Sequence, residues 1–460
     1  MSRRAPLISR VQVPGTALRA LAEHAPHDYP VFCDSAAQGP LARYSLLAAA
    51  PVASLTRDAR GRLDAIAVDT VPGGFLDNLK AWTLRERRPR EADMGGLPFT
   101  GGWLVYLGYE TAAEIEPRLK LPRADDAYSA FALRVTNLAV HDLAADAVFV
   151  VTEDGDAAAH EALIARLRKA TRPPSDGRPL RLAAIEEDAP ERFLAQVRAA
   201  QDHIAAGDIY QANLSRAWRL ELADARDAGQ VYAALRAANP APFAARAIWR
   251  GQSILSSSPE RLLRIEGRDI STRPIAGTRA RQVVKEGGSL DQDRLDTAEL
   301  VQHPKERAEH IMLIDLERND LGRVCEAGSV VVDEYMVTES YAHVHHIVSN
   351  VRGRLRAGTT AVDALRALFP GGTITGCPKV RCMELIAEIE GQGRGAYTGS
   401  LGWIGTDGDA DFNILIRTLT QRDTQITLRA GAGIVADSVP ERELEETRAK
   451  ARGLLRAFET

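Results

Sequence analysis

Two pairs of glutamates in this chain have a spacing that could hold a divalent cation. Glu306 and Glu309 lie three residues apart in a helical stretch, and Glu443 and Glu446 repeat this spacing near the end of the chain. Residues at positions i and i+3 share one helix face, so each pair can present two carboxylates in one direction. Mg²⁺ prefers oxygen ligands and is commonly held by one or two carboxylates together with an anionic substrate. A solvated helix face that pairs with neighbouring lysines and arginines fits the same spacing, and both interpretations stay open.

Glycine-rich segments and one arginine indicate an anionic ligand. Residues 370–376 and 430–433 are rich in glycine, and we expect them to form loops. Backbone N–H groups without a neighbouring Cβ can approach a carboxylate or phosphate closely, although tight turns explain such glycines equally well. Neither GxxxxGK[ST] nor GxGxxG occurs, so a nucleotide site is not supported. Arg417 lies within the apolar run 414–419, which we expect to be a strand, and a buried guanidinium there needs an acidic partner.

Three histidines stand close together at positions 343, 345 and 346. In a strand, His343 and His345 would share one face and His346 would lie on the other. A zinc site needs further His or Cys ligands at suitable spacing, and none are nearby. We therefore expect a role without a metal for His346, or a purely structural one.

The elements that must position these residues alternate between helices and strands. Residues 193–206 carry apolar side chains at helical spacing and are followed by Gly207, a typical residue for a helix end. We expect strands at 210–218, 253–260 and 273–278, a helix at 305–316 that stops at 318–322, and a terminal helix at 442–458. The proline-rich stretch 171–179 is the strongest linker candidate, so we place an organisational break near residue 185.

The composition narrows the classes of function. The 460 residues are 45% hydrophobic and 26% charged, which is ordinary for a folded globular protein. Fifty-eight basic and 62 acidic side chains give a net charge of −4, without the cationic excess that favours nucleic acid.

The four cysteines form no CxxC pair, and we expect them to be reduced. The amino-terminal residues lack the apolar core of a secretory signal, and no apolar run is long enough to span a membrane. We expect a cytoplasmic enzyme or binding protein with no nucleic-acid or membrane partner.

A series of segments resembles the chorismate-utilising enzymes, a family that includes anthranilate synthase component I, aminodeoxychorismate synthase component I, and the isochorismate and salicylate synthases. In chain order the segments are GDIYQANLSR (207–216), SSPERLL (257–263), RPIAGTRAR (273–281), ERAEHIMLIDLERNDLGRV (306–324), HHIVSNVRG (345–353), FPGGTITGCPKVRCMELI (369–386), AYTGSLGWIG (396–405), FNILIRTLT (412–420) and AGAGIVADSVPERELEETRAKARGLL (430–455). The resemblance implies one large α/β (α+β) unit, a two-sheet sandwich flanked by helices as in anthranilate synthase. Residues 1–184 would form an N-terminal subdomain intertwined with a chorismate-binding catalytic region, 185–460.

The resemblance also implies how the substrate is held. Glu309 and Glu446 are the expected Mg²⁺ ligands, and Glu306 and Glu443 are expected either to hold metal-bound water or to lie behind the ligands and orient them. The metal would grip the ring carboxylate of chorismate. The groups expected at the enolpyruvyl carboxylate are Arg417, Tyr397, Lys450 and the backbone N–H groups of Gly431, Ala432 and Gly433. The residues expected to line the ring are Thr278, His346 and Thr373.

The residues expected at the catalytic centre are Glu260, His346, Ala276 and Gln211. Glu260 matches the family's general acid, which protonates the C4 hydroxyl as it leaves while a nucleophile adds at C2. That role needs a pKa raised by burial. The isochorismate and salicylate synthases carry a lysine at the position of Gln211, where it activates water. An amide cannot act as a base near neutral pH, whereas ammonia needs no such base, so amination is favoured over hydration.

The source of ammonia and the product follow from the same resemblance. Family members that use ammonia usually take it from a separate glutamine amidotransferase subunit, and this chain lacks the Gly-x-Cys-x-Gly nucleophile turn of that subunit. Many aminodeoxychorismate synthases have a lysine at the position of Ala276, whereas anthranilate synthases typically have alanine. The segment GGWLVYLGYETAAEIEP (101–117) nevertheless resembles aminodeoxychorismate synthases, of which one subclass also has this alanine. We expect that subclass, with anthranilate synthase as the alternative and a catalytically silent subunit as a third interpretation.

Overall fold

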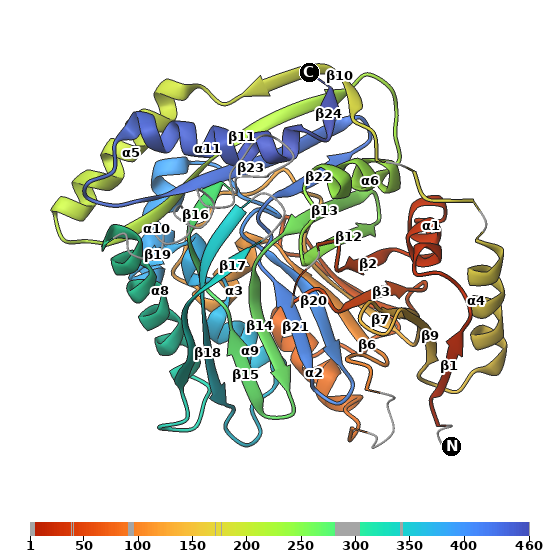
Figure 1. The fold of residues 1–460 in the computed structure, drawn as a ribbon. Coiled ribbons are helices and arrows are strands. Elements are labelled where there is room, and N and C mark those ends of the chain that lie inside the picture. Colours follow the sequence, from red (N-terminus) through yellow and green to blue (C-terminus); the bar gives the residue numbers. More distant parts are fainter. Residues whose placement is uncertain are drawn as a thin grey trace.

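The computed structural model describes residues 5–37, 39, 41–90, 96–170, 172–175, 177–280, 304–340 and 344–459. At 276–280, 304–306, 340 and 344–346 it describes the backbone alone. Two large, mainly antiparallel sheets face each other, and helices cover the outer face of each sheet (Figure 1). The predicted two-sheet sandwich flanked by helices is confirmed.

The first sheet contains strands from both halves of the chain. Its spatial order is β1 (Leu7–Val11), β9 (Ala147–Thr152), β8 (Asn137–Asp142), β3 (Tyr44–Ala48), β2 (Val31–Asp34), β12 (Phe243–Trp249), β13 (Gln252–Ser258), β22 (Thr418–Arg422), β23 (Gln425–Ile434), β11 (Gln211–Leu222), β10 (Leu180–Glu187) and β24 (Phe458–Glu459). The short strand β19 (Gly376–Cys377) also pairs with β11.

The second sheet has the same mixed origin. Its spatial order is β16 (Ile275–Ala280), β18 (Val344–Arg354), β15 (Asp269–Thr272), β14 (Arg261–Glu266), β21 (Ala410–Asn413), β20 (Ser400–Gly405), β6 (Gly102–Leu107), β7 (Tyr128–Val135), β4 (Ala53–Asp58) and β5 (Leu63–Ile66). Strand β17 (Val331–Ser340) pairs with β18. The chain therefore crosses from one sheet to the other several times, as between β13 and β14.

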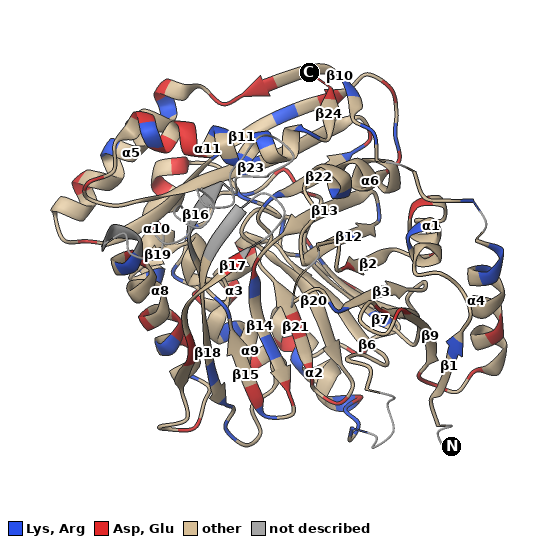
Figure 2. Ribbon diagram, viewed as in Figure 1, with Lys and Arg blue, Asp and Glu red and all other residues tan. Residues whose placement is uncertain are grey.

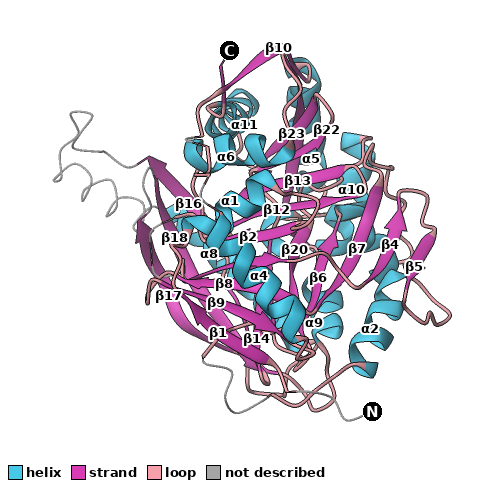
Figure 3. Cartoon of the chain, turned by 90° about the vertical axis from the view of Figure 1, so that its right-hand side faces the viewer, coloured by secondary structure: helices cyan, strands magenta, loops and turns pink. Residues whose placement is uncertain are grey.

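Helices form the outer layers on both sides. They are α1 (Thr16–His24), α2 (Phe75–Arg85), α3 (Ala112–Ile115), α4 (Ala157–Lys169), α5 (Pro190–Ala205), α6 (Ala228–Ala238), α8 (Pro304–Gly322), α9 (Ala361–Leu368), α10 (Lys379–Glu390) and α11 (Pro440–Leu455), with short 3₁₀ turns η1 (Tyr109–Thr111) and η3 (Gly372–Ile374). Figure 3 shows α1 and α4 in front of the first sheet, whereas α2 and α9 pack on the second sheet. Basic and acidic side chains are interspersed on the outer helices α5, α8 and α11 (Figure 2).

Strand alternation divides the core into layers. In β6, Leu104 and Tyr106 join the apolar cluster between the sheets, while Trp103 and Val105 join the cluster beneath α2 and α9. Successive side chains of a strand point to opposite faces, so a wholly apolar strand is buried on both sides. This explains why the only polar side-chain groups of β6 are the Trp103 indole N–H and the Tyr106 hydroxyl.

Local sequence signals set several helix ends. The Asp156 carboxylate accepts hydrogen bonds from the amides of Ala158 and Ala159 and so caps the start of α4. Thr360 and Asp363 form a capping box at the start of α9. Gly391 ends α10 in the left-handed conformation, with φ of 61°.

Some predicted boundaries moved. The helix predicted at 305–316 continues to Gly322, because Leu321 is fully buried in the core and Asp320 pairs with Lys379 from α10. The predicted terminal helix is α11, which begins earlier, at Pro440, and ends at Leu455. Residue 185 lies inside β10, and both predicted subdomains contribute strands to each sheet. Among the described residues, no helix is long and apolar enough to cross a membrane.

Candidate active site

Two neighbouring crossovers between the sheets carry the central residues of the candidate site. One crossover, at Pro259 and Glu260, joins β13 of the first sheet to β14 of the second. The other, ending at Arg417, joins β21 to β22. The amide of Ile414 donates to the carbonyl of Glu260 over 3.0 Å, and the amide of Ser257 donates to the carbonyl of Arg417 over 3.0 Å. These hydrogen bonds hold the two crossovers side by side where the sheets meet.

Glu260 is a buried carboxyl group. Its side chain accepts a hydrogen bond of 2.8 Å from the hydroxyl of Thr373, which lies in η3. Burial raises the pKa of Glu260 to about 7, against the opposing effect of the Thr373 hydrogen bond, and the neighbouring Glu317 carboxylate raises it further. A carboxyl group with this pKa is partly protonated at neutral pH and can donate a proton to a leaving group. The expectation of a raised pKa for Glu260 agrees with this environment.

Arg417 does not lie in a strand as predicted. It occupies a bend after β21, with φ of 51°, because the chain must turn there from one sheet into the other. Its guanidinium has no hydrogen-bond or ion-pair partner among the residues that the structure describes. Burial lowers the pKa of Arg417, while the nearby Glu260 raises it. Among the described residues, the expected acidic partner does not form an ion pair with Arg417, and this guanidinium is suited to a carboxylate ligand.

Gly431 and Gly433 lie in strand β23, not in the predicted loop. A Cβ at Gly431 would lie 2.5 Å from the hydroxyl of Tyr397, and a Cβ at Gly433 would lie 2.5 Å from Nε2 of Gln211. A side chain at either position would therefore displace these polar groups from the strand. Ala432, between them, points to the opposite face and is fully buried among the apolar residues of α5 and α10.

Gln211 faces the same part of β23. Its Nε2 donates to Oε1 of Glu309 over 3.2 Å. Its Oε1 is buried and has no hydrogen-bond partner in the described part of the chain. A buried acceptor without a donor is costly, so this oxygen is suited to a ligand that carries N–H or O–H groups.

The predicted metal carboxylates border β23 from two helices. Glu309 of α8 lies beside Gly433, 3.5 Å from a Cβ built there. Glu446 of α11 pairs with Lys450 over 2.7 Å, and Nζ of Lys450 also donates to the carbonyl of Gly431 over 2.8 Å. Glu443 is 8% exposed. Among the described residues, no three acidic, histidine or cysteine side chains form a metal-binding cluster. The donor chemistry fits Mg²⁺, which commonly binds one or two protein carboxylates and completes its shell with substrate and water.

The remaining predicted residues are placed through the backbone alone. Thr278 and His346 are directly opposite each other in the β16–β18 pairing, and Ala276 is opposite Ile347. The structure does not describe the side chains of Ala276, Thr278, His346 and Glu306. His343 is outside the described residues altogether.

Sequence reasoning missed the groups that support Tyr397. The Tyr397 hydroxyl donates over 3.5 Å to the side-chain Oδ1 of Asn213, which follows Gln211 by two residues on β11. The Arg394 guanidinium lies over the Tyr397 ring at 5.6 Å. Glu110 accepts hydrogen bonds from the amides of Arg394 and Gly395, and Asp126 accepts one from Ala396. Asn213 shares a strand face with Gln211, and this period-two spacing was the one available signal.

Comparisons with known proteins agree with this architecture. A family model described as chorismate binding enzyme matches residues 37–456. The chain belongs to the chorismate-binding enzymes.

Within this family the chain is similar to members with different names. It is 42% identical to anthranilate synthase component 1 of Streptomyces coelicolor, over 80% of this chain and 74% of the relative. It is 40% identical to aminodeoxychorismate synthase component 1 of Bacillus subtilis, over 78% of this chain and 77% of the relative. The crystal structure of anthranilate synthase component I from Streptococcus pneumoniae aligns with a TM-score of 0.77 and 30% identity, covering 91% of this chain and 93% of that one.

Proposed function

We propose that this chorismate-binding enzyme aminates chorismate to 4-amino-4-deoxychorismate, as an aminodeoxychorismate synthase component I. The observation that carries the proposal is the juxtaposition of the protonatable Glu260 with the guanidinium of Arg417, which has no ion pair among the described residues, at neighbouring crossovers. An anionic ring substrate held by Arg417 would bring a leaving hydroxyl toward a proton donor.

Glu260 is the general acid in this scheme. It donates its proton to the C4 hydroxyl, which leaves as water while the nitrogen of ammonia bonds to C2. A second ammonia then bonds to C4 and expels the C2 amine, giving the product without a covalent lysine. The unpartnered Oε1 of Gln211 supports this order, because an amide oxygen can accept an N–H of ammonia but cannot deprotonate water.

Other groups hold and orient the substrate. Arg417 and the Tyr397 hydroxyl bind the enolpyruvyl carboxylate, with the backbone of Gly431 to Gly433 and Lys450 at its edge. Thr278, His346 and Thr373 line the ring. Glu309 and Glu446 would bind Mg²⁺, with Glu306 and Glu443 beside them, and the bound metal would neutralise and orient the ring carboxylate. The ammonia would come from a separate glutamine amidotransferase, and a cytoplasmic location follows from the same proposal.

The product is decided by a direct assay. The purified chain is incubated with chorismate, Mg²⁺ and excess ammonium at mildly alkaline pH, where Glu260 is still partly protonated, with and without aminodeoxychorismate lyase. Formation of p-aminobenzoate that depends on the lyase supports the proposal. Anthranilate fluorescence without the lyase selects the alternative, anthranilate synthase component I, to which relatives such as the Streptomyces enzyme point. Bound chorismate with no turnover identifies a silent subunit.

A further inference from the structure

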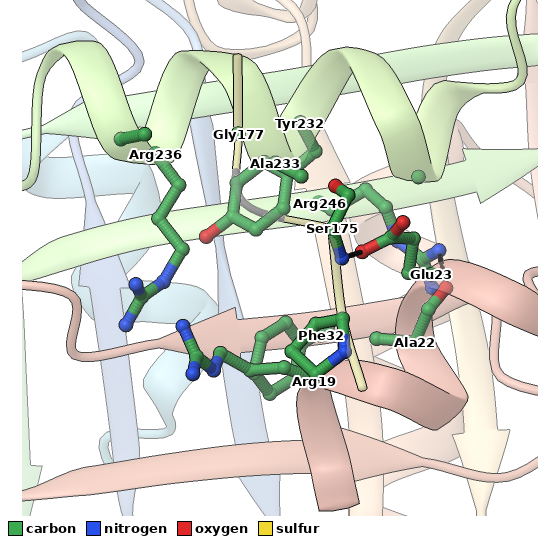
Figure 4. A pocket seen from close by; sticks show the side chains of 13 residues that line it. Arg19, Ala22, Glu23, Phe32, Ser175, Gly177, Tyr232, Ala233, Arg236 and Arg246 are labelled. Carbon is green, nitrogen blue, oxygen red and sulfur yellow. Dashed lines mark hydrogen bonds between the residues drawn. The ribbon is translucent and has the colours of Figure 1, made fainter. Parts of the chain in front are cut away.

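A small cavity lies on the outer face of the first sheet, away from the candidate active site. It has a volume of about 80 Å³ and is enclosed by α1, α6, the strands β2 and β12, and Pro174, Ser175 and Gly177 from the segment before β10 (Figure 4). Side chains from these elements line it, among them Arg19, Phe32, Tyr232, Arg236 and Arg246. None of the residues assigned above to chorismate chemistry belongs to this cavity.

Arg246 places a positive charge at the base of the cavity. It is fully buried and donates to the carbonyl oxygens of Ala22 and Tyr29. Its Nε is buried without a partner among the described residues. Burial lowers the pKa of Arg246 to about 10, so the guanidinium remains charged at neutral pH.

Arg19 and Arg236 face each other across the opening. Figure 4 shows their guanidinium groups extending toward one another from α1 and α6. Nε of Arg236 lies 2.5 Å from Oδ2 of Asp34. Arg19 has no hydrogen bond or ion pair in the part of the chain that the structure describes. Burial and the charge of Arg236 both lower the pKa of Arg19, which reflects repulsion between the two guanidinium groups.

Three carboxylates lie near these guanidinium groups, and each already has another partner. Asp34 is engaged by Arg236 and by the Tyr232 hydroxyl, which donates to it over 3.1 Å. Glu23 accepts a hydrogen bond of 2.9 Å from the amide of Ser175, and Asp227 accepts one of 3.0 Å from the amide of Gln230. Among the described residues, neither Arg19 nor Arg246 forms an ion pair, so an additional anion would reduce the repulsion between the guanidinium groups.

We propose that this cavity binds a small oxyanion, a phosphate or carboxylate group, between Arg19 and Arg236. The planar guanidinium fork matches either group bidentately, and Arg236 has N–H groups left over after its contact with Asp34. The volume accommodates the oxyanion itself, so a larger ligand would have to extend from it through the opening.

The test is titration calorimetry of the full chain with inorganic phosphate and, separately, with acetate, at constant ionic strength. Arg19→Gln removes one charge-assisted contact and should weaken binding by roughly 10–100-fold. Arg168→Gln, which removes an exposed arginine of α4, is the matched control and should bind like the unsubstituted chain. Binding of phosphate but not acetate identifies a tetrahedral oxyanion, whereas equal binding of both identifies a carboxylate-type site.

Thermal unfolding gives an independent readout. Without an added oxyanion, Arg19→Gln should unfold at the same temperature as the unsubstituted chain or at a higher one, because it relieves repulsion with Arg236. With phosphate present, the unsubstituted chain should unfold at a higher temperature than Arg19→Gln. Phosphate binding that is absent from the unsubstituted chain, or equal in Arg19→Gln and Arg168→Gln, would overturn the proposal whatever the product of the chorismate reaction is.

Discussion

The hydroxyl of Thr373 donates a hydrogen bond to Oε1 of Glu260 over 2.8 Å, at the point where the chain passes between the two sheets. The hydrogen bond orients the carboxyl group and favours its ionised form, while burial favours its neutral form more strongly. The two effects together leave Glu260 with a pKa of about 7.

Activity should therefore fall as the pH rises through the pKa of Glu260. A general acid acts in its protonated form, so kcat/KM measured at constant free ammonia should decline about tenfold per pH unit above a midpoint near 7. Thr373→Val removes the hydrogen bond that lowers this pKa, so its alkaline limb should move to higher pH. If the alkaline limb of the kcat/KM profile had the same midpoint in Thr373→Val as in the unsubstituted chain, Glu260 would not be the titrating acid.

Removal of the Arg417 guanidinium should weaken chorismate binding without lowering the stability of the folded chain. Arg417→Met should raise the chorismate KM by roughly 10–100-fold, the usual effect of one charge-assisted contact. Its free energy of unfolding should stay equal or increase, because the lost charge is half-buried and forms no ion pair with the described residues. Arg261→Met is the contrasting variant: Arg261 binds both oxygens of Asp411, at 2.9 and 3.0 Å, so its loss should lower stability. A strongly destabilised Arg417→Met protein would argue for a structural role.

Substitution of Gly433 should disturb the candidate site without leaving a cavity in the hydrophobic core. In Gly433→Ala the new methyl group would lie 2.5 Å from Nε2 of Gln211 and displace that amide from Glu309. We expect kcat to fall by roughly 10–100-fold, since small displacements of positioning groups have effects of this size. Gly322→Ala on α8 meets no atom within 4 Å and should leave turnover unchanged. Equal activity of both variants would exclude Gln211 from the reaction.

The two-sheet architecture could be predicted better than the site's local conformation. The family resemblance implied two facing sheets and assigned Glu260 and Arg417 to the same substrate. The apolar run 414–419, however, gave no sign that the chain bends at Arg417. The bend depends on a hydrogen bond with Ser257, which is far away in the sequence. Tertiary contacts decide such positions.

The glycines of β23 illustrate the same limit. Spacing alone could not decide whether Gly431 and Gly433 form a loop or a strand. The deciding contacts come from Tyr397 and Gln211, which approach from other elements. Glu110 lies in the quoted segment 101–117 and Asp126 lies outside every quoted segment, but the sequence assigned a role to neither. Only the folded chain shows that they hold the segment before Tyr397.

Glu309 should control the requirement for Mg²⁺. Glu309→Gln keeps the shape of the side chain and removes its charge, so the Mg²⁺ concentration for half-maximal activity should rise about tenfold or more. Glu445→Gln changes a more exposed glutamate of α11, paired with Arg448, and should leave that concentration unchanged. Chelation by EDTA should abolish turnover of the unsubstituted chain, and added Mg²⁺ should restore it. Full activity of Glu309→Gln at low Mg²⁺ would refute the metal assignment.

Asp126 should make stability depend on pH. Burial raises the pKa of Asp126 to about 7, and the Glu110 carboxylate adds to the effect. Because this pKa is higher in the folded chain than in the unfolded one, where it is about 4, the folded chain binds more protons between these values. The free energy of unfolding should then fall as the pH rises from about 4 to 7.

Asp126→Asn provides the matched comparison for that pH dependence. The amide stays neutral, and its oxygen can still accept the hydrogen bond from Ala396. Urea denaturation should show similar stabilities near pH 4, whereas near pH 8 Asp126→Asn should be more stable by about 1–4 kcal/mol, the free energy of up to three pKa units. Since Asp126 holds the segment that carries Tyr397, the chorismate KM of Asp126→Asn should vary less between pH 6 and 8 than that of the unsubstituted chain. Parallel pH–stability curves for the two proteins would show that Asp126 does not titrate in this range.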